Sequence, residues 1–279
     1  MLDGVMLLWW ILTIPSFLFV VIDIWRSTPE SPVLKWAFVI LTAFTGPLGA
    51  FFYVLGCREP LRGTHDEYIA TRWRQVLGST MHCVAGDGIG IVVAAAVGSG
   101  LALSFWPDFL FEYLLGFGFG WAFFQAFAMR DMAGGSYLAS LKMTFLPELL
   151  SMNLLMTGMV LTSSFAMMSA GGGQMTMGAP TRPQFWFVMS MALIVGFVCA
   201  YPINWWLVAN HLKHGMLTVR RKSEPAPMAG MAMGDTSGQM PEATSPPADR
   251  LSSGVKAAIA FLTFAVLGAA LATVVPFAR

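Results

Sequence analysis

The sequence predicts an all-α membrane protein, a polytopic transmembrane helical bundle with about seven spanning helices and short interfacial helices. Of its 279 residues, 56% are hydrophobic and only 11% are charged, whereas a soluble domain carries about 25% charged residues. Apolar runs close to the roughly 20 residues that cross a bilayer recur along the whole chain. The net charge of +1 gives no basic surface for nucleic acid, so we exclude a nucleic-acid partner.

Seven apolar segments of spanning length are predicted in order. The first lacks the basic start and the small-residue cleavage site of a signal peptide, so we expect a spanning helix there. We group the chain into an N-terminal two-helix segment (1–56), a four-helix membrane core (57–216), a linker (217–254) and a C-terminal transmembrane helix (255–279). The segments lie near 4–25, 34–56, 81–105, 107–129, 146–170, 184–212 and 255–277.

Two stretches between these segments are predicted to lie in the membrane interface. "THDEYIATRWRQVLGST" begins with a capping box, Thr64 to Glu67, and places its apolar side chains on one helical face. "GGSYLASLKMTF" repeats the pattern before the fifth segment. The linker is different, because it is rich in Pro, Gly, Ser and Met and has almost no large apolar residue. We predict that it is disordered.

The loops predict an orientation, since basic residues collect on the cytoplasmic side. Seven spans would place four basic residues on one side, namely Arg26, Lys35, Arg182 and Arg279. The N-terminus is then expected in the cytoplasm and the C-terminus in the periplasm of a bacterial inner membrane. The other twelve fall together on the cytoplasmic side, namely Arg58, Arg62, Arg72, Arg74, Arg130, Lys142, Lys213, Arg220, Arg221, Lys222, Arg250 and Lys256.

The third segment opens with ligand-type residues in "TMHCVAGDGIGIVVAAAV". At about 100° per residue, His82, Cys83 and Asp87 share a face with Gly86 and Gly90. Ionisable groups in a membrane helix are costly and usually face the bundle interior. This pattern indicates a metal or proton site. The alternative is a polar clasp between His82 and Asp87.

The fifth segment carries a stripe of soft donors. Thioethers suit Cu(I), and a carboxylate could assist at one end, so the stripe suggests a Cu(I) path. Flexible apolar packing is the alternative. Further methionines cluster at 167–177 and 228–233. The stripe consists of Glu148, Met152, Met156, Met159, Ser163 and Met167.

The sixth segment ends in "YPINWWLVANHLKHGM". Asn204 and His211 share a face. The alternative role of His211, Lys213 and His214 is to favour the helix dipole, and we prefer this interpretation for His214. Glu112 is expected to form a separate site nearer the outside. The candidate metal ligands are therefore His82, Cys83, Asp87, Glu148, Met152, Met156 and His211, which are expected to meet in the inner half of the membrane.

The pairing of "HCVAGDGIG" with the end of the sixth segment resembles an uncharacterised bacterial membrane family, domain of unknown function 4396, over roughly residues 70–216. Its members look to be found beside copper proteins, which would favour metal handling, but the resemblance implies no catalytic residues. "GPLGAFFYVLGCREP" also looks like a short membrane hairpin found in unrelated bacterial proteins.

These observations lead to three hypotheses of function. The first is transport or handling of a soft metal ion, most readily Cu(I). The second is a structural or assembly factor for a membrane metalloprotein complex. The third is a membrane enzyme that uses His82 and Asp87 for proton transfer, although the chain shows no catalytic motif and the prediction leans away from an enzyme. The expected partners are the lipid bilayer and copper proteins or another membrane subunit.

Overall fold

The computed structural model describes residues 2–61, 63–130, 133–169, 180–215 and 251–277. All regular structure among these residues is helical, so the all-α prediction is confirmed. Five helices are long and apolar enough to cross a membrane, which is compatible with a multi-pass membrane protein. They begin with α1 (Leu2–Ser27), and they continue with α5 (Arg72–Gly100), α8 (Tyr137–Ser169), α9 (Pro183–Ala209) and α10 (Ser253–Val274).

The predicted span 34–56 is wrong, because this segment folds as two short helices that turn back on themselves. Helix α2 (Pro32–Thr45) ends at Gly46, whose φ of 56° is tolerated best by glycine, and α3 (Pro47–Gly56) begins at the next residue. Gly46 lies against Trp9 and Thr13 of α1. With its ten residues, α3 is about 15 Å long, half the hydrocarbon thickness of a bilayer.

Polar contacts hold the open end of this hairpin to the end of α1. The Tyr53 hydroxyl donates to Asp23 at 2.7 Å, and Arg58 Nε pairs with the same carboxylate at 2.7 Å. The Thr28 hydroxyl bonds Tyr53 at 2.9 Å. Because both ends of the hairpin lie at one end of α1, the chain enters and leaves on the same side.

The predicted interfacial helices are much shorter than expected. Helix α4 (His65–Ile69) has five residues, and Thr64 bonds the Leu61 carbonyl instead of forming the capping box. The next helix begins at Arg72, so His82 lies about 15 Å along α5 rather than at its opening. The second predicted interfacial stretch does not form a separate helix, because it is the first part of α8.

The fourth predicted segment is helical from 105 to 128 but changes its winding in the middle. Helix α6 (Phe105–Phe119) passes into a π-helical stretch, η1 (Gly120–Gln125), and then into α7 (Ala126–Ala128). Gly116 and Gly120 let this stretch pack closely on α5, since a Cβ at Gly90 of α5 would lie 2.7 Å from the Gly116 Cα.

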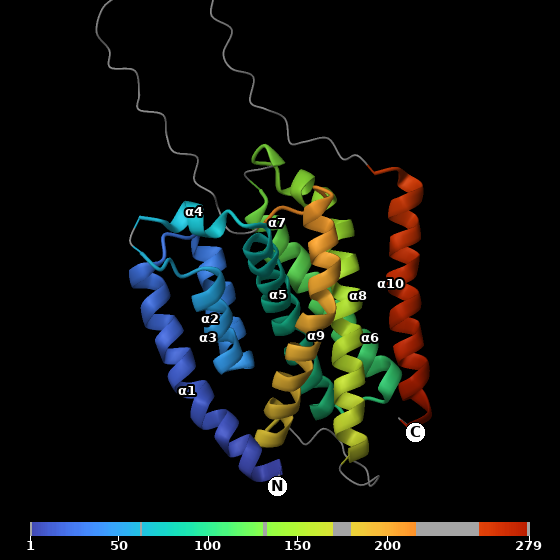
Figure 1. The fold of residues 1–279 in the computed structure, drawn as a ribbon. Helices are drawn as coiled ribbons and strands as arrows, with labels where there is room; N and C mark the ends of the chain where they lie inside the picture. Colours follow the sequence, from blue (N-terminus) through green and yellow to red (C-terminus); the bar gives the residue numbers. More distant parts are fainter. Residues whose placement is uncertain (1, 62, 131–132, 170–179, 216–250, 278–279) are drawn as a thin grey trace, which may run out of the picture.

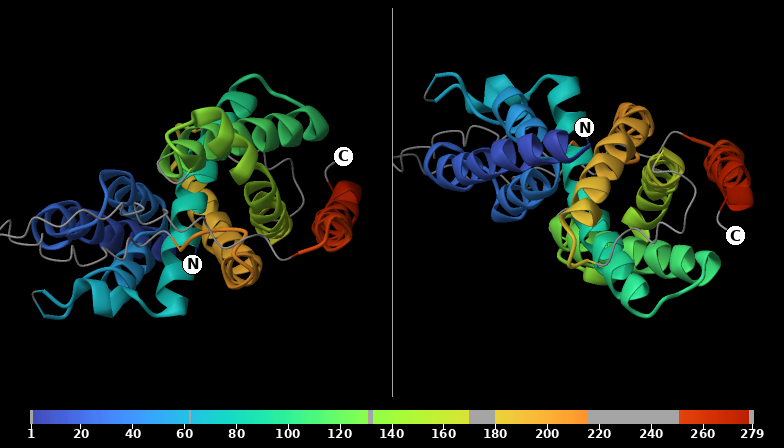
Figure 2. Two further views of the ribbon diagram at one scale, coloured as in Figure 1. Left: turned by 90° about the horizontal axis from the view of Figure 1, so that it is seen from above. Right: turned by 90° about the horizontal axis from the view of Figure 1, so that it is seen from below.

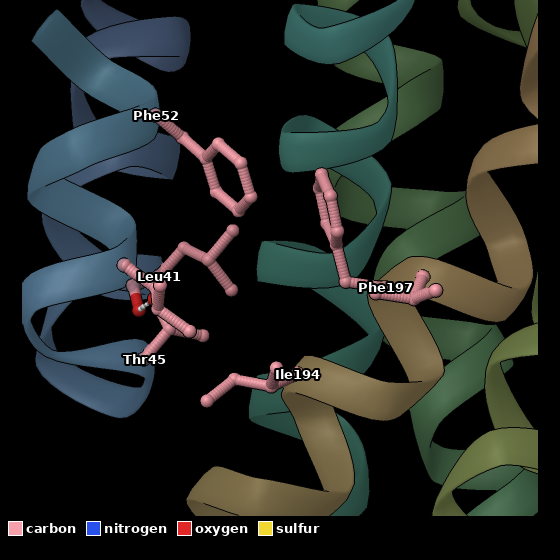
Figure 3. Close-up of a pocket in the computed structure, with 7 residues that line it drawn as sticks. Leu41, Thr45, Phe52, Ile194 and Phe197 are labelled. Atoms are coloured by element: carbon pink, nitrogen blue, oxygen red, sulfur yellow. Dashed lines mark hydrogen bonds between the residues drawn. The ribbon is translucent and has the colours of Figure 1, made fainter. Parts of the chain in front are cut away.

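The helices form a central group flanked by two lateral parts. Figure 2 shows α1, α2 and α3 on one flank of the group formed by α5 to α9, with α10 on the other flank. Between the hairpin and α9 lies a small apolar cavity of about 100 Å³, beside the stacked rings of Phe52 and Phe197 (Figure 3). Helix α10 packs on α8 through Thr263, Leu267, Ala270 and Val274, and the short 3₁₀ turn η3 (Val275–Phe277) follows it.

The hairpin also affects the prediction that the two ends of the chain lie on opposite sides of the membrane. Figure 1 draws the start of α1 and the end of α10 at the same end of the bundle, so the prediction that they lie on opposite sides is not supported. Residues 216–250, which hold nearly all of the predicted linker and the methionines at 228–233, lie outside the described residues.

Candidate functional site

A buried polar cluster is centred on Cys83, on α5. Its Sγ lies 3.0 Å from Glu148 Oε2 of α8. The sulfur also accepts hydrogen bonds from the Gln125 amide of η1 and from the Lys213 ammonium, which follows α9. The side chains of Cys83 and Glu148 are fully buried, and Gln125 and Lys213 are nearly so. Four elements that are distant in sequence therefore meet at one sulfur.

Lys213 reaches this cluster because α9 ends in a sharp turn. Asn210 caps the helix, His211 follows with a φ of 60°, and the Leu212 N–H donates to the Leu207 carbonyl at 3.0 Å. This is the Schellman arrangement that ends many helices, with His211 in the place usually taken by glycine. The turn directs the chain back over the bundle, and the Lys213 side chain enters it.

The Lys213 ammonium has an acceptor for each of its three N–H groups. It donates to Cys83 Sγ, to Asn204 Oδ1 at 2.9 Å and to Glu148 Oε2 at 3.4 Å. An ammonium has three donors and no acceptor, so this environment matches the protonated form. Burial acts to lower the pKa of Lys213, but the nearby Cys83 and Glu148 raise it, and the net direction is upward.

Asp87 faces Glu148 without any donor of its own. A Cβ added at Gly120 would overlap Asp87 Oδ1 and lie 3.0 Å from Glu148 Oε1, so the two carboxylates meet beside this glycine. Both side chains are fully buried. Among the described residues, no group donates a hydrogen bond to Asp87 Oδ1, Asp87 Oδ2 or Glu148 Oε1. A buried carboxylate without a partner is unstable unless a proton or a cation neutralises it.

The charges of the cluster do not cancel. Asp87 and Glu148 contribute two negative charges when ionised, and Lys213 contributes one positive charge. Glu148 and Lys213 are the charged groups that act on Asp87. The cluster therefore needs one more positive charge to be neutral, which one proton or one monovalent cation supplies.

His82 lies beside the cluster but turns away from it. Its Nε2 is 3.1 Å from the Phe124 carbonyl in η1, so Nε2 carries the proton of a neutral ring. The other nitrogen, Nδ1, is buried and has no partner among the described residues. His82 and Asp87 form no hydrogen bond with each other. The His82–Asp87 pair expected of an enzyme, or of a polar clasp, is therefore not present.

The structure brings together only part of the predicted metal set. Cys83, Asp87 and Glu148 meet, whereas His211 is exposed in the turn after α9 and is wrong as a member of this group. Met152 and Met156 are fully buried in the apolar core. In the part of the chain that the structure describes, no group of three or more His, Cys, Asp and Glu side chains is arranged to hold a metal ion.

Two members of the cluster were missed from the sequence. Lys213 was interpreted as a partner of the helix dipole, and Gln125 carried no signal except its position in an apolar segment. Asn204 was placed correctly on the inner face, where it bonds Ser151 Oγ at 2.9 Å. Glu112 lies on α6 two turns before Gly120, and a separate site there stays a prediction.

The fold and the site thus define a helical protein with membrane-length helices and a buried charged cluster. The chain belongs to the family described as domain of unknown function DUF4396, which matches residues 72–213. The match runs from the start of α5 to Lys213 and contains Cys83, Asp87, Gln125 and Glu148. Comparisons with curated proteins and with solved structures found no match.

Proposed function

We propose that this protein is an integral membrane protein that binds and passes a monovalent cation at the cluster of Cys83, Asp87, Glu148 and Lys213. The observation that carries the proposal is the close approach of the buried Asp87 and Glu148 carboxyl groups, of which only Glu148 Oε2 has the Lys213 ammonium as a partner. Intramembrane ionisable groups that face the bundle interior are typical of ion and proton pathways. Two carboxylates balanced by a single ammonium suit an ion that exchanges with a proton.

Cu(I) is the metal ion that fits this site best. It carries one charge, and the Cys83 sulfur is a soft donor of the kind that Cu(I) prefers. In the described conformation the Lys213 ammonium contacts this sulfur, so the metal ion has to displace that contact. Binding through sulfur breaks the S–H bond of the thiol, forms a metal–sulfur bond and releases one proton to water.

The proposed topology has six crossings and a hairpin that returns to its own side. Helices α1, α5, α8, α9 and α10 cross, and so does the continuous stretch 105–128. Nine of the ten described basic residues then lie at one end of the bundle, and only Arg182 lies at the other. This end is cytoplasmic by the positive-inside rule. The nine are Arg26, Lys35, Arg58, Arg72, Arg74, Arg130, Lys142, Lys213 and Lys256.

Cu(I) binding to the purified chain tests the proposal. The wild-type protein, kept anaerobic in detergent, should bind about one Cu(I) per chain, since the cluster is centred on the single sulfur of Cys83. Cys83→Ser should lose this binding. Cys199→Ser is the matched control, because Cys199 is a half-buried cysteine of α9 without a contact to the cluster, and it should bind like the wild type.

Two results would reject Cu(I) as the ion. One is a wild-type protein that binds no more Cu(I) than Cys83→Ser. The other is an equal loss in Cys199→Ser, which would indicate unspecific thiol binding. A folded wild type without Cu(I) binding would favour the role of a structural or assembly factor for another membrane subunit.

A further inference from the structure

Lys213 and Cys83 place an amine and a thiol in direct contact inside the bundle. Lys213 Nζ lies 2.5 Å from Cys83 Sγ, although the two residues are 130 positions apart in the sequence. The Cys83 side chain is fully buried, and that of Lys213 is nearly so. The fold of α5 and of the turn after α9 therefore holds a nucleophilic sulfur against a primary amine in a buried place.

The neighbouring side chains fix both partners of this pair. Asn204 Oδ1 accepts a hydrogen bond from the amine at 2.9 Å, and the Gln125 amide donates to the sulfur at 2.6 Å. The Cys83 S–H donates to Glu148 Oε2 at 3.0 Å, and the same oxygen lies 3.4 Å from Lys213 Nζ. One carboxylate is thus within reach of the protons of both the thiol and the amine.

We propose that Cys83 and Lys213 form a redox-sensitive modification site, at which oxidation by hydrogen peroxide joins Sγ and Nζ in a covalent S–N bond. A thiol that is oxidised to a sulfenic acid condenses with a neighbouring thiol or nitrogen. The Lys213 nitrogen is the neighbour that this fold supplies. The inference goes beyond the proposed function, because the bond forms in the metal-free protein.

The reaction has two balanced steps. First, the Cys83 sulfur attacks hydrogen peroxide, so an S–O bond forms and the O–O bond breaks. The S–H proton passes through Glu148 to the departing oxygen, which leaves as water, and the sulfur loses the two electrons that the peroxide gains. Second, the Lys213 ammonium gives one proton to Glu148, and Nζ attacks the sulfenic sulfur. An S–N bond forms, the S–O bond breaks, and the hydroxyl leaves as water with a second proton from the nitrogen.

Burial favours this outcome over further oxidation. Hydrogen peroxide is small and uncharged, so it does not meet the desolvation cost that keeps ions out of an apolar interior. A sulfenic acid that stays free is oxidised on to sulfinic and sulfonic acids, which thiol reductants do not reverse. The S–N bond is reversible, because a dithiol that supplies two electrons and two protons restores the thiol and the amine.

Peptide mass spectrometry on the full-length chain in detergent tests the S–N bond. The wild type is treated with hydrogen peroxide in the presence of a metal chelator, unfolded, alkylated and digested. We expect a linked pair of peptides that contains Cys83 and Lys213 and is lighter than the sum of its two parts by about 2 Da, the mass of two hydrogen atoms. Dithiothreitol should remove the link and restore the Cys83 thiol.

Lys213→Arg is the matched variant, because it keeps the positive charge but lacks the nucleophilic amine. Peroxide should give no linked peptides in this variant, and Cys83 should proceed to acids that dithiothreitol does not reduce. Lys213→Met should give the same result, and size-exclusion profiles show which of the two variants is folded. Cys199, a half-buried cysteine of α9 outside the cluster, is the internal control and should be oxidised without a link in every sample.

Three outcomes would overturn the inference. In the folded wild type, Cys83 could be oxidised to sulfinic or sulfonic acid while Lys213 stays unlinked. The Cys83 thiol could also stay intact at a peroxide concentration that fully oxidises Cys199. A linked pair that is heavier by about 14 Da would contain an oxygen atom between sulfur and nitrogen and would exclude the S–N bond. Copper binding does not enter these measurements, so failure of the proposed function leaves their results unchanged.

Discussion

His211 and Lys213 show how the backbone after α9 decides the roles of neighbouring side chains. Both residues follow the last turn of the helix, and the sequence gives no reason to prefer one. The turn at His211, with its positive φ, leaves that side chain exposed and turns Lys213 inward. Hydropathy cannot indicate this choice, because the direction of a side chain after a helix depends on the capping geometry.

The turn at His211 should become more stable when this residue is replaced by glycine. A non-glycine residue in the left-handed region costs about 1 kcal/mol, so His211→Gly should raise Tm in detergent by about 2 °C. His214→Gly is the control, because His214 is absent from the positive-φ residues and should lose stability instead. If His211→Gly abolished Cu(I) binding, His211 would be a ligand after all.

The two buried methionines of α8 should behave differently toward Cu(I). Met152 lies one turn beyond Glu148, and its Cε approaches Gly116, whereas Met156 lies about 12 Å beyond Glu148 along the helix. Met152→Leu should therefore weaken Cu(I) binding several-fold, and Met156→Leu should leave it unchanged. Both swaps conserve volume and cost under about 1.5 kcal/mol. Equal affinities in competition titrations of both variants would leave Met152 as a packing residue.

At the scale of elements, the π-helical stretch η1 leaves space for the Asp87 carboxyl group and supplies the Gln125 amide. It begins at Gly120, where a Cβ would overlap Asp87 Oδ1, and it ends at Gln125, which contacts Cys83. A π-turn inside an α-helix is rare and often marks a functional site. Its position could not be predicted, because "GFGFG" is equally compatible with simple helix packing.

Gly120→Ala should disturb the site far more than Gly118→Ala. The added methyl at Gly120 collides with the Asp87 carboxylate, whereas a methyl at Gly118 would have no other part of the protein within 4 Å. We expect Gly120→Ala to lower Cu(I) affinity about tenfold or more, in keeping with the displacement of a binding group. Gly118→Ala should bind Cu(I) as tightly as the wild type. Identical binding in the two variants would remove Gly120 from the site.

The hairpin of α2 and α3 illustrates the limit of segment prediction. Composition alone gives 34–56 a spanning length, and the apolar character of the segment is correct. The Gly46–Pro47 pair is a strong breaker of helices and is the signal that the segment turns. The polar residues that hold its open end, Asp23, Tyr53 and Arg58, come from separate parts of the chain, so only the folded structure shows them together.

For the whole molecule, the proposed six-crossing topology places the N-terminus on the periplasmic side, opposite to the side that the sequence predicts. Reporter proteins that are active only in the periplasm should be active when fused before Met1 and after Arg279. A fusion in the linker after Lys222 should be silent. An inactive fusion before Met1, combined with an active one after Arg279, would restore an odd number of crossings and contradict the hairpin.

The proposed cation site depends on contacts that connect four parts of the chain, and only some of its residues could be predicted. Cys83, Asp87 and Glu148 stand out in the sequence because ionisable groups are rare in apolar helices. Lys213 does not stand out, because basic residues after a spanning helix are common and usually lie in the lipid headgroups. The position of Lys213 inside the cluster therefore required the structure.

Proton release on ion binding tests directly whether the ion replaces a proton in this cluster. Ag⁺ is added to the wild-type protein in a weakly buffered detergent solution, and the pH change is recorded with the number of ions bound. We expect about one proton released per Ag⁺, because Ag⁺ replaces the proton of the Cys83 thiol. Cys83→Ser should bind no Ag⁺ and release no protons. Tight binding of Ag⁺ to the wild type without proton release would contradict a cluster that holds one exchangeable positive charge.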